Sequence, residues 1–493
     1  MPQRGRPKIL GIGQRFTFNL LLLLLLNVLV KPVWLFGIDR GVQNAVGAGA
    51  YGVYYALFSL SLMLNMLLDM GLTAYNNRAL SRNPSLLPKF SSRVVGIKLV
   101  LLVLYAVVVL AAFAALGYST EHLPLVGLLI FNQFLASVLL YLRSNLNALQ
   151  RFAADSLLSV LDKLLMVLLF GLVLWGGWGW GVTVLGFVLA QSAAYLLTLL
   201  LAAVLVVRMG GQLRPRLHVA SARIMLRRSW PFALLALLMA AYYRIDVLMV
   251  ERLLPQGGRQ AGVYAQAYRL FDAYLMFPYL VSTLLLPIFG RLLKHGAAVD
   301  AFLGLAFRAM LVPVLALAVP TGCFAQPLME LLYHSHVDEA ARVLPLFMGS
   351  FVCISVSYIL GTLLTAHGAI RGLNVLSAVA LALGVALQLL LLPALGLRGA
   401  ALAGLCMHVV IAVAQVVMCY CVWGIGPKLG SMLRYVLFVL LTVFISVVAV
   451  RYWPTVWGFA FCVGGGMLLS VVMGLIRLSE LRGLLRGAPT IAE

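Results

Sequence analysis

The sequence YYRIDVLMVE (Tyr242–Glu251) closes an apolar run that begins near Trp230. A helix rises about 1.5 Å per residue, so residues 230–250 are long enough to cross the hydrocarbon core of a bilayer, about 30 Å thick. Within this run Arg244 and Asp246 carry full charges. The stretch therefore predicts a membrane-spanning helix that contains a cation and an anion.

The whole chain has the composition of an integral membrane protein. Of its 493 residues, 63% are hydrophobic and only 10% are charged, and the mean hydropathy is +1.05. Soluble domains carry about 25% charged residues, so a soluble protein is excluded. Apolar stretches of about 20 residues recur between short polar breaks, as an all-α polytopic bundle requires. We predict about fourteen spans, at residues 16–36, 51–70, 94–116, 123–142, 155–175, 182–207, 230–250, 263–289, 302–324, 343–364, 373–393, 399–421, 433–450 and 455–475.

The net charge of +22 is explained by membrane topology and gives no reason to expect a nucleic-acid partner. With the amino terminus in the cytoplasm, 24 of the 36 Lys and Arg residues fall in inner segments. Six fall in outer segments, among them Arg40. Basic residues of membrane proteins concentrate on the cytoplasmic side. We therefore expect a multi-pass protein with both termini in the cytoplasm.

Three pairs of similar segments indicate an internal repeat. AYGVYYALFSL from Ala50 matches QAGVYAQAYRL from Gln260, and LNALQRFAADSLLSVL from Leu146 resembles LTAHGAIRGLNVLSAV from Leu364. A third pair, GWGVTVLGFVLAQ and LRGAALAGLCMHV, follows in the same order at nearly the same offset. Each pair is shifted by six predicted helices. Such a shift preserves the direction of each helix, so the repeat is parallel.

The repeat predicts two six-helix lobes and a carboxy-terminal addition. The expected parts are an amino-terminal lobe at 10–208, a basic cytoplasmic linker at 209–228, a carboxy-terminal lobe at 229–424, two extra transmembrane helices at 425–476 and a cytoplasmic tail at 477–493. Ser229 is expected to cap the first helix of the second lobe, with Pro231 in its first turn.

Ten charged residues remain inside the predicted spans. Each costs about 2.5–3.5 kcal/mol at a helix centre, so it needs water, a partner or a function. Lys98, Lys163 and Arg308 lie near the cytoplasmic ends of their helices. Their long side chains can reach the headgroups, and we expect them to snorkel. Arg244 is fourteen residues past Trp230, roughly 20 Å from the inner face, and is too deep for this.

Six of the ten charges lie on the first two helices of the two lobes, which correspond in the repeat. If the lobes face each other, these helices line a water-filled cleft. We predict a cationic, substrate-binding cavity formed by Lys31, Arg244 and Arg269. The candidates for ion coupling are the carboxylates of Asp246, Asp272 and Asp69.

Helix geometry limits how these charges pair. Arg244 and Asp246 are about 200° apart around the helix axis, so they cannot satisfy each other, and which of them faces the cavity is open. Arg269 and Asp272 are three residues apart and can pair on one face. The alternative interpretation is a network of inter-helix salt bridges that holds the bundle together without binding a ligand.

The sequence predicts no catalytic site, metal or cofactor. YHSHVDEA (Tyr333–Ala340) clusters two histidines and two acids, but histidines two residues apart point to different faces of a helix, so we do not assign a metal. No D-x-D pair, nucleophile elbow or P-loop is present, so we do not expect an enzyme. Intramembrane amides, among them Asn65, Asn132 and Gln133, are expected to join helices.

Two long segments resemble a known family. GAGAYGVYYALFSLSLMLNMLLDMGLTAYNNRALSR (Gly47–Arg82) and YYRIDVLMVERLLPQGGRQAGVYAQAYRLFDAYLMFPYLVSTLLLPIFG (Tyr242–Gly290) are similar to the polysaccharide flippases of the multidrug/oligosaccharidyl-lipid/polysaccharide exporter (MOP) superfamily. The resemblance covers nearly the whole chain. It implies a MATE-like fold in which two six-helix lobes alternate access to a central cavity, and the lipid II flippases add two helices. By that analogy Lys31, Arg244 and Arg269 lie on cavity helices.

The same resemblance implies a function. Such a flippase translocates undecaprenyl-pyrophosphate-linked oligosaccharide repeat units across the bacterial inner (cytoplasmic) membrane for O-antigen or exopolysaccharide biosynthesis. The expected partners are this polyprenyl-pyrophosphate-linked oligosaccharide, membrane lipids and other polysaccharide-assembly proteins. The alternative is a cation-coupled multidrug or toxin exporter, which would need a cavity richer in carboxylates or aromatic groups. A polymerase or ligase would need a larger exterior loop than the sequence offers.

Overall fold

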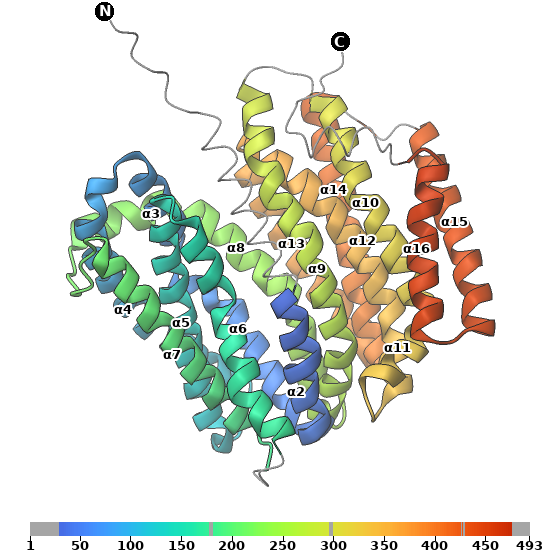
Figure 1. Cartoon of the computed structure of the whole chain (residues 1–493), viewed down its shortest axis with the longest axis horizontal. Helices are drawn as coiled ribbons and strands as arrows, with labels where there is room; N and C mark the ends of the chain where they lie inside the picture. The colour runs from blue at the N-terminus through green and yellow to red at the C-terminus, as the bar shows by residue number, and fades with distance from the viewer. Residues whose placement is uncertain (1–28, 177–180, 295–298, 425, 427–428, 476–493) are drawn as a thin grey trace, which may run out of the picture. The chain divides into compact units, whose positions relative to one another are not determined.

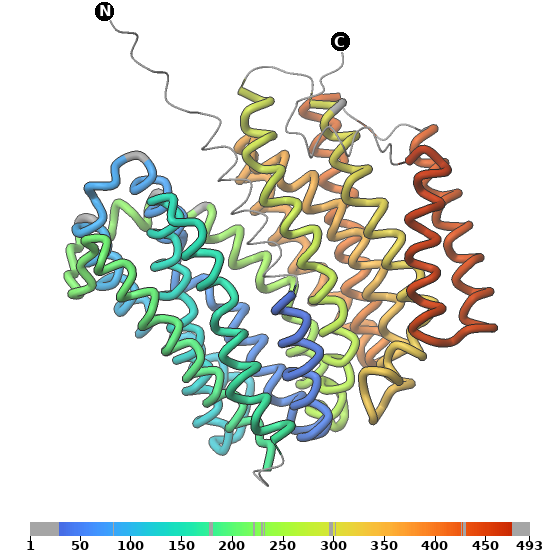
Figure 2. The backbone as a smooth tube through the Cα atoms, viewed as in Figure 1, coloured from blue at the N-terminus to red at the C-terminus, as the bar shows by residue number. Residues whose placement is uncertain are grey.

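The computed structural model describes residues 29–176, 181–294, 299–424, 426 and 429–475 (Figure 1; Figure 2). Within these ranges every regular element is a helix and no strand occurs, so the predicted all-α fold class is confirmed. The chain folds into two compact units, unit 1 up to Arg244 and unit 2 from Ile245.

Unit 1 is built around one central helix. Its elements are η1 (Val33–Asp39), α2 (Arg40–Leu64), η2 (Asn65–Leu68), α3 (Leu72–Arg82), η3 (Pro84–Leu86), α4 (Leu87–Ala115), η4 (Thr120–His122), α5 (Leu123–Ala148), α6 (Phe152–Trp175), α7 (Val184–Arg208) and the first part of α8 (Val219–Leu253). Helix α5 packs against α2, α3, α4, α6 and α7. It therefore forms the core of the unit.

Unit 2 repeats this plan and adds two helices. Its elements are the end of α8, α9 (Gly257–Lys294), α10 (Val299–Cys323), α11 (Ala325–Leu332), α12 (Val337–His367), α13 (Ile370–Leu395), α14 (Leu397–Trp423), α15 (Leu429–Tyr452) and α16 (Val456–Val472). The central helix is α12, which packs against α9, α10, α11, α13 and α14. Since α5 and α12 are the fourth and tenth predicted spans, they correspond in the predicted repeat. The two added helices, α15 and α16, pack on α10 and on each other.

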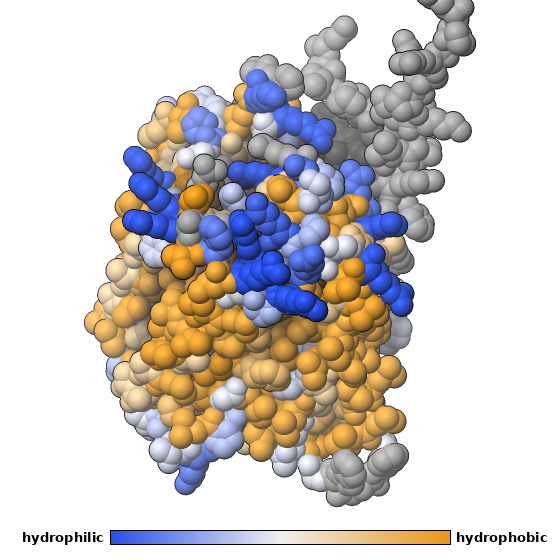
Figure 3. Space-filling view, turned by 90° about the vertical axis from the view of Figure 1, so that its left-hand side faces the viewer, coloured by the Kyte–Doolittle hydropathy of each residue, from blue (hydrophilic) through white to orange (hydrophobic). Residues whose placement is uncertain are grey.

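The predicted spans agree with the helices. Twelve helical stretches in the described residues are long and apolar enough to cross a membrane. One of them, Leu29–Leu68, covers the end of the predicted span 16–36 and most of 51–70, and α16 is a shorter apolar helix. Helices thus match thirteen of the predicted ranges, and most of 16–36 lies outside the described residues. Figure 3 shows the broad hydrophobic surface expected of such a protein, below a hydrophilic band.

The connection between the first two spans differs from the prediction. Residues 37–50, expected to form an outer loop, are helical in η1 and α2. Only Gly47 departs from helical geometry, with φ 81° and ψ 164°. The prediction was wrong because glycine and the charged pair Asp39 and Arg40 are typical of loops, whereas the Asp39 side chain is buried here.

Replacing Gly47 by alanine is expected to destabilise the protein by about 1–3 kcal/mol, because only glycine adopts this backbone conformation without strain. No atom lies within 4 Å of the position that a Cβ would take, so the strain would come from the backbone alone. Gly49 has equally open surroundings inside α2. Gly49→Ala is therefore the matched control and is expected to be neutral or stabilising. Thermal unfolding of the purified variants measures both, and equal midpoints would contradict this role of Gly47.

Amide side chains fix the register of α5 against α2 and α3. Asn65 donates a hydrogen bond to Gln133 Oε1, and Gln133 Nε2 donates to Ser61 Oγ at 3.4 Å. Further along α5, Asn145 Oδ1 accepts from Asn76 Nδ2 at 2.6 Å. For Asn65 and Gln133 the prediction that intramembrane amides join helices is confirmed.

The start of α8 also differs from the prediction. The helix begins at Val219, ten residues before the expected cap at Ser229, so the second half of the predicted linker 209–228 is helical. The prediction was wrong because Ser and Pro favour a helix start there. Packing overrides this preference, since Met225 is buried in the core of unit 1. The division between the two units lies inside α8, and the predicted lobe boundaries stay a prediction.

Candidate functional site

Arg244 binds a buried tyrosine of unit 1. Its Nη1 donates a hydrogen bond to Tyr55 Oη of α2 at 3.1 Å. Tyr55 is fully buried and stacks on Tyr51, with ring centroids 6.1 Å apart and ring planes 15° apart. Tyr51 Oη in turn donates to Asp39 Oδ2 at 2.8 Å. Arg244 and Asp39 thus each hold one of two stacked tyrosines on α2, and this fixes where the guanidinium lies.

Asp246 follows two residues later and binds a tyrosine of unit 2. Its Oδ2 accepts from Tyr264 Oη of α9 at 2.7 Å, and its Oδ1 accepts from the Val247 amide at 2.8 Å. Tyr264 is fully buried and meets Phe347 edge to face, with ring centroids 5.0 Å apart. The tyrosines that bind Arg244 and Asp246 lie on different helices, as the wide angle between the two side chains around α8 requires.

Each unit contains an arrangement of this kind, in which a carboxylate accepts a hydrogen bond from a tyrosine. Asp39 and Asp246 each accept a hydrogen bond from a buried tyrosine on the following transmembrane helix. Asp39 is 1% exposed and was missed by the sequence analysis because its segment was assigned to a loop. One signal identifies it, since the dipeptide Ile-Asp at 38–39 recurs at 245–246. This offset of 207 residues is close to that of the repeat.

Lys31 lies among other charges of unit 1. It is half-buried, and its charged neighbours are Lys163 and Asp162 of α6 and Arg143 of α5. Lys163 itself pairs with Asp162 at 3.0 Å, and its ammonium lies 4.6 Å from the ring centroid of Trp34. The expectation that Lys163 snorkels is therefore wrong, because its charge is held inside the unit. Of the predicted cations in unit 1, Lys31 thus has its charged neighbours on α5 and α6, whereas the tyrosine that Arg244 binds is on α2.

Asp69 forms an ion pair with Lys98. Lys98 Nζ donates to Asp69 Oδ1 at 2.9 Å, to Ser137 Oγ at 2.7 Å and to the Leu68 carbonyl at 3.2 Å. Thr73 also donates to the Asp69 carboxylate through its hydroxyl and its amide. The Lys98 side chain is only 1% exposed, so the expectation that it snorkels is wrong. Lys98 lies close enough to the cytoplasmic end of its helix to reach the headgroups, which is why snorkelling was predicted. The sequence alone does not show that its side chain faces Asp69 instead.

The remaining predicted charges lie on α9 in unit 2. Arg269 is 6% exposed, and Asp272 is half-buried one helical turn later. Pairing between these two side chains stays a prediction. The same holds for their roles in binding and coupling.

The histidine-containing segment after α11 is tied to α9. Arg259 Nη2 donates to Glu339 Oε1 at 2.5 Å, and Arg259 Nε donates to His336 Nε2 at 3.3 Å. Gln326 of α11 also donates to Asp338 Oδ1 at 2.6 Å. In the part of the chain that the structure describes, no group of three or more His, Cys, Asp and Glu side chains is placed to hold a metal ion. The contacts around Arg259 give this polar segment a structural role.

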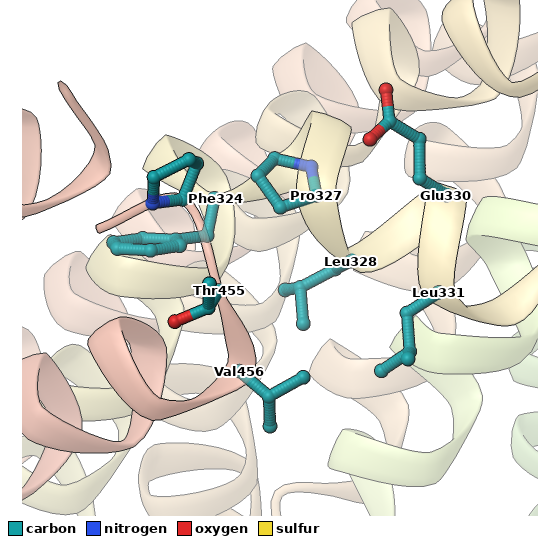
Figure 4. Close-up of a pocket in the computed structure, with 8 residues that line it drawn as sticks. Phe324, Pro327, Leu328, Glu330, Leu331, Thr455 and Val456 are labelled. Atoms are coloured by element: carbon teal, nitrogen blue, oxygen red, sulfur yellow. The ribbon is translucent and has the colours of Figure 1, made fainter. Parts of the chain in front are cut away.

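A pocket of about 340 Å³ lies in unit 2 between α11 and the turn that joins α15 to α16 (Figure 4). Its walls are mainly apolar and include Phe324, Leu328 and Val456. The Glu330 carboxylate points away from Val456 and accepts from Gln326 at 2.8 Å. The pocket contains none of the predicted binding or coupling residues.

Solved structures with the same fold include flippases and multidrug transporters. "Lipid II flippase MurJ, inward closed conformation" matches with a TM-score of 0.70 at 13% identity, over 96% of this chain and 99% of that one. A multidrug resistance MATE family transporter of the MOP superfamily, inward-facing, matches with a TM-score of 0.60 at 16% identity, over 80% of this chain and 93% of that one. The predicted MATE-like fold is confirmed.

A third solved structure is a MOP superfamily transporter from Pyrococcus furiosus, described as having a binding pocket of reverse polarity. It matches with a TM-score of 0.57 at 15% identity, over 82% of this chain and 93% of that one. At such identities the similarity concerns the fold alone.

Sequence comparison gives the family. None of the curated proteins matches this chain. The family described as polysaccharide biosynthesis protein matches residues 17–293, which is more than half of the chain. This multi-pass membrane protein therefore belongs to the polysaccharide biosynthesis protein family.

Proposed function

We propose that the protein is a flippase that carries undecaprenyl-pyrophosphate-linked oligosaccharide repeat units across the bacterial inner membrane by alternating access. The observation that supports this most directly is the guanidinium of Arg244, which lies within a predicted membrane span and is oriented by the buried Tyr55. It belongs to a chain of the polysaccharide biosynthesis protein family. A guanidinium has five N–H donors, so a bond to Tyr55 is compatible with bonds to a pyrophosphate. Lys31 and Arg269 complete the proposed cationic set.

The proposed direction is from the cytoplasmic to the outer leaflet, for assembly of O-antigen or exopolysaccharide. It rests on the proposed function, since such repeat units would be made in the cytoplasm; the positive-inside distribution of Lys and Arg supports a topology with both termini in the cytoplasm. Other polysaccharide-assembly proteins would supply the repeat unit and consume it. The chemistry of sugar transfer is left to these partners.

Carboxylates are proposed to couple transport to a gradient of protons or sodium ions. The Asp246 carboxylate accepts from Tyr264 and from a backbone amide. Binding of a proton would remove the negative charge that both donors contact, and would therefore weaken the link between Asp246 and Tyr264 of α9. Asp272 is the second candidate. For Asp69, the ion pair with Lys98 favours a structural role.

A strain that lacks the protein is expected to lose its surface polysaccharide and to accumulate undecaprenyl-pyrophosphate-linked repeat units. Mass spectrometry of extracted lipids measures the accumulation, and electrophoresis of cell-surface material measures the loss. Complementation with the intact gene is the control. Normal surface polysaccharide without accumulated intermediate in the deletion strain would contradict the proposal.

The alternative function is export of organic cations, because multidrug transporters share the fold. The same deletion strain discriminates between the two. Increased susceptibility to a panel of cationic drugs together with unchanged surface polysaccharide would favour the exporter. The cations Lys31, Arg244 and Arg269 favour an anionic substrate instead.

A further inference from the structure

The basic segment between α7 and α8 is docked on the start of α4. Ser92 Oγ donates to the Arg214 carbonyl at 2.6 Å, and the Arg216 amide donates to the Ser92 carbonyl at 3.1 Å. The backbone amide of Gln212 donates a hydrogen bond to Ser91 Oγ at 2.9 Å. Three hydrogen bonds thus fix the position of a segment whose composition is that of a loop.

Gly96 allows this close approach. A Cβ at Gly96 would lie 2.8 Å from the Arg216 carbonyl oxygen and 2.9 Å from its carbonyl carbon. Both distances are shorter than real Cβ contacts, and the atoms belong to the backbone and cannot rotate away. The docked position of Arg216 therefore requires glycine at position 96.

Docking gathers exposed cations at one end of unit 1. We call the following set the basic platform: Arg78 of α3, Lys89 of α4, Arg208 of α7, Arg214 and Arg216 of the docked segment, and Arg223 and Arg227 of α8. The sequence has no Asp or Glu between residues 70 and 100 or between 205 and 230. Figure 3 shows hydrophilic residues gathered in a band above the apolar surface on this side of the molecule. The platform thus carries excess positive charge that no neighbouring acid in these segments neutralises.

Exposed apolar side chains are interleaved with these cations. Leu217 is 56% exposed, Val219 70%, Ile224 53% and Trp230 50%. Apolar residues among arginines are typical of segments at the bilayer surface, where the cations bind lipid phosphates and the apolar groups enter between the headgroups. An acidic soluble protein would match the charge but not these apolar residues.

We propose that the basic platform is a binding site for the phosphate groups of anionic phospholipids in the adjacent leaflet, and that docking on α4 preassembles it. The basic platform does not include Lys31, Arg244 or Arg269, which form the proposed substrate site. Its failure would therefore leave the proposed flippase function untouched, and the reverse also holds.

The test is calorimetric titration of the full-length protein, in uncharged detergent, with dihexanoyl phosphatidylglycerol. The variant Arg214→Gln/Arg216→Gln/Arg223→Gln is expected to bind at least tenfold more weakly, because each basic residue near a lipid surface contributes roughly a fivefold factor. The control is Arg342→Gln/Arg398→Gln/Arg451→Gln, which removes three exposed arginines elsewhere and is expected to change the affinity less than twofold. Equal affinities of the two triple variants would overturn the proposal.

Two variants test preassembly, because they retain every charge. Gly96→Leu displaces the docked backbone and is expected to weaken binding by roughly fivefold, as if one cation were lost. Ser92→Ala removes the hydrogen bond to Arg214 and serves if Gly96→Leu does not fold, as judged by gel filtration. If the folded variant binds dihexanoyl phosphatidylglycerol with wild-type affinity, the proposal that docking on α4 preassembles the basic platform is overturned.

Three further titrants identify the ligand class. Dihexanoyl phosphatidylcholine, which has no net charge, is expected to bind at least tenfold more weakly than phosphatidylglycerol. Inorganic phosphate is expected to compete poorly, because it lacks acyl chains for the apolar residues. Equal affinity for phosphatidylcholine, equal affinity for free phosphate, or displacement of the lipid by a poly-glutamate peptide at lower concentration would each overturn the assignment to anionic phospholipid.

Discussion

Replacing Lys98 by methionine is expected to destabilise the protein by about 3–5 kcal/mol, because removal of one partner leaves a buried charge uncompensated. The ammonium of Lys98 holds three groups at once: the Asp69 carboxylate, the Ser137 hydroxyl and the Leu68 carbonyl. Leu68 ends η2, and its carbonyl lies where the helix stops. Methionine has a similar length but donates no hydrogen bond, so all three contacts would be lost together.

Thermal unfolding in detergent measures the effect, and for a chain of this length a loss of this size corresponds to a midpoint lower by about 3–5 °C. Lys89→Met is the matched control, since Lys89 is an exposed lysine on the same helix, and its effect is expected within about 0.5 kcal/mol. Adding Asp69→Asn to Lys98→Met is expected to restore part of the stability, because it removes the orphaned charge. A wild-type midpoint for Lys98→Met would show that the ion pair contributes nothing.

Replacing Arg244 by alanine is expected to slow delivery of surface polysaccharide by about ten- to a hundredfold. A hydrogen bond to a charged group contributes about 1.5–3 kcal/mol, and 1.4 kcal/mol corresponds to a factor of ten. Combining this change with Lys31→Ala and Arg269→Ala is expected to abolish delivery. Rates are measured by pulse-labelling in the deletion strain, with the amount of protein in the membrane determined in parallel.

Two further variants separate charge from position. Tyr55→Phe keeps the guanidinium but removes the phenol that orients it, so a smaller loss is expected than for Arg244→Ala. Arg151→Ala removes an exposed cation of the same unit and is expected to have no effect. The cationic-site proposal would be untenable if the triple alanine variant were present at the wild-type level and delivered polysaccharide at the normal rate.

The transmembrane helices were predictable because hydropathy over about 20 residues is a local property. The parallel repeat was also visible, since α5 and α12 occupy the same central place in their units. The helical stretch before Gly47 was not predictable from the same signal. A single residue with positive φ connects two helices there, and polar residues around it look like a loop until their partners are known.

The candidate site was only partly predictable, because contacts between helices depend on which face each residue presents. Depth along α8 predicted that Arg244 does not snorkel, but nothing local identified Tyr55 as its partner. For Lys98, distance from the helix end suggested the headgroups, whereas the ion pair with Asp69 lies in the interior. Asp39 carried a detectable signal in the repeated Ile-Asp dipeptide, which local hydropathy obscures.

The amide contacts along α5 have a mechanical consequence. Gln133 bonds Asn65 and Ser61, while Asn145 further along the helix bonds Asn76. Sliding α5 by one helical turn, about 5.4 Å, would break all of these bonds at the same time. We therefore expect α5 to keep its position relative to α2 and α3 during a transport cycle, so that these helices move together as a rigid body.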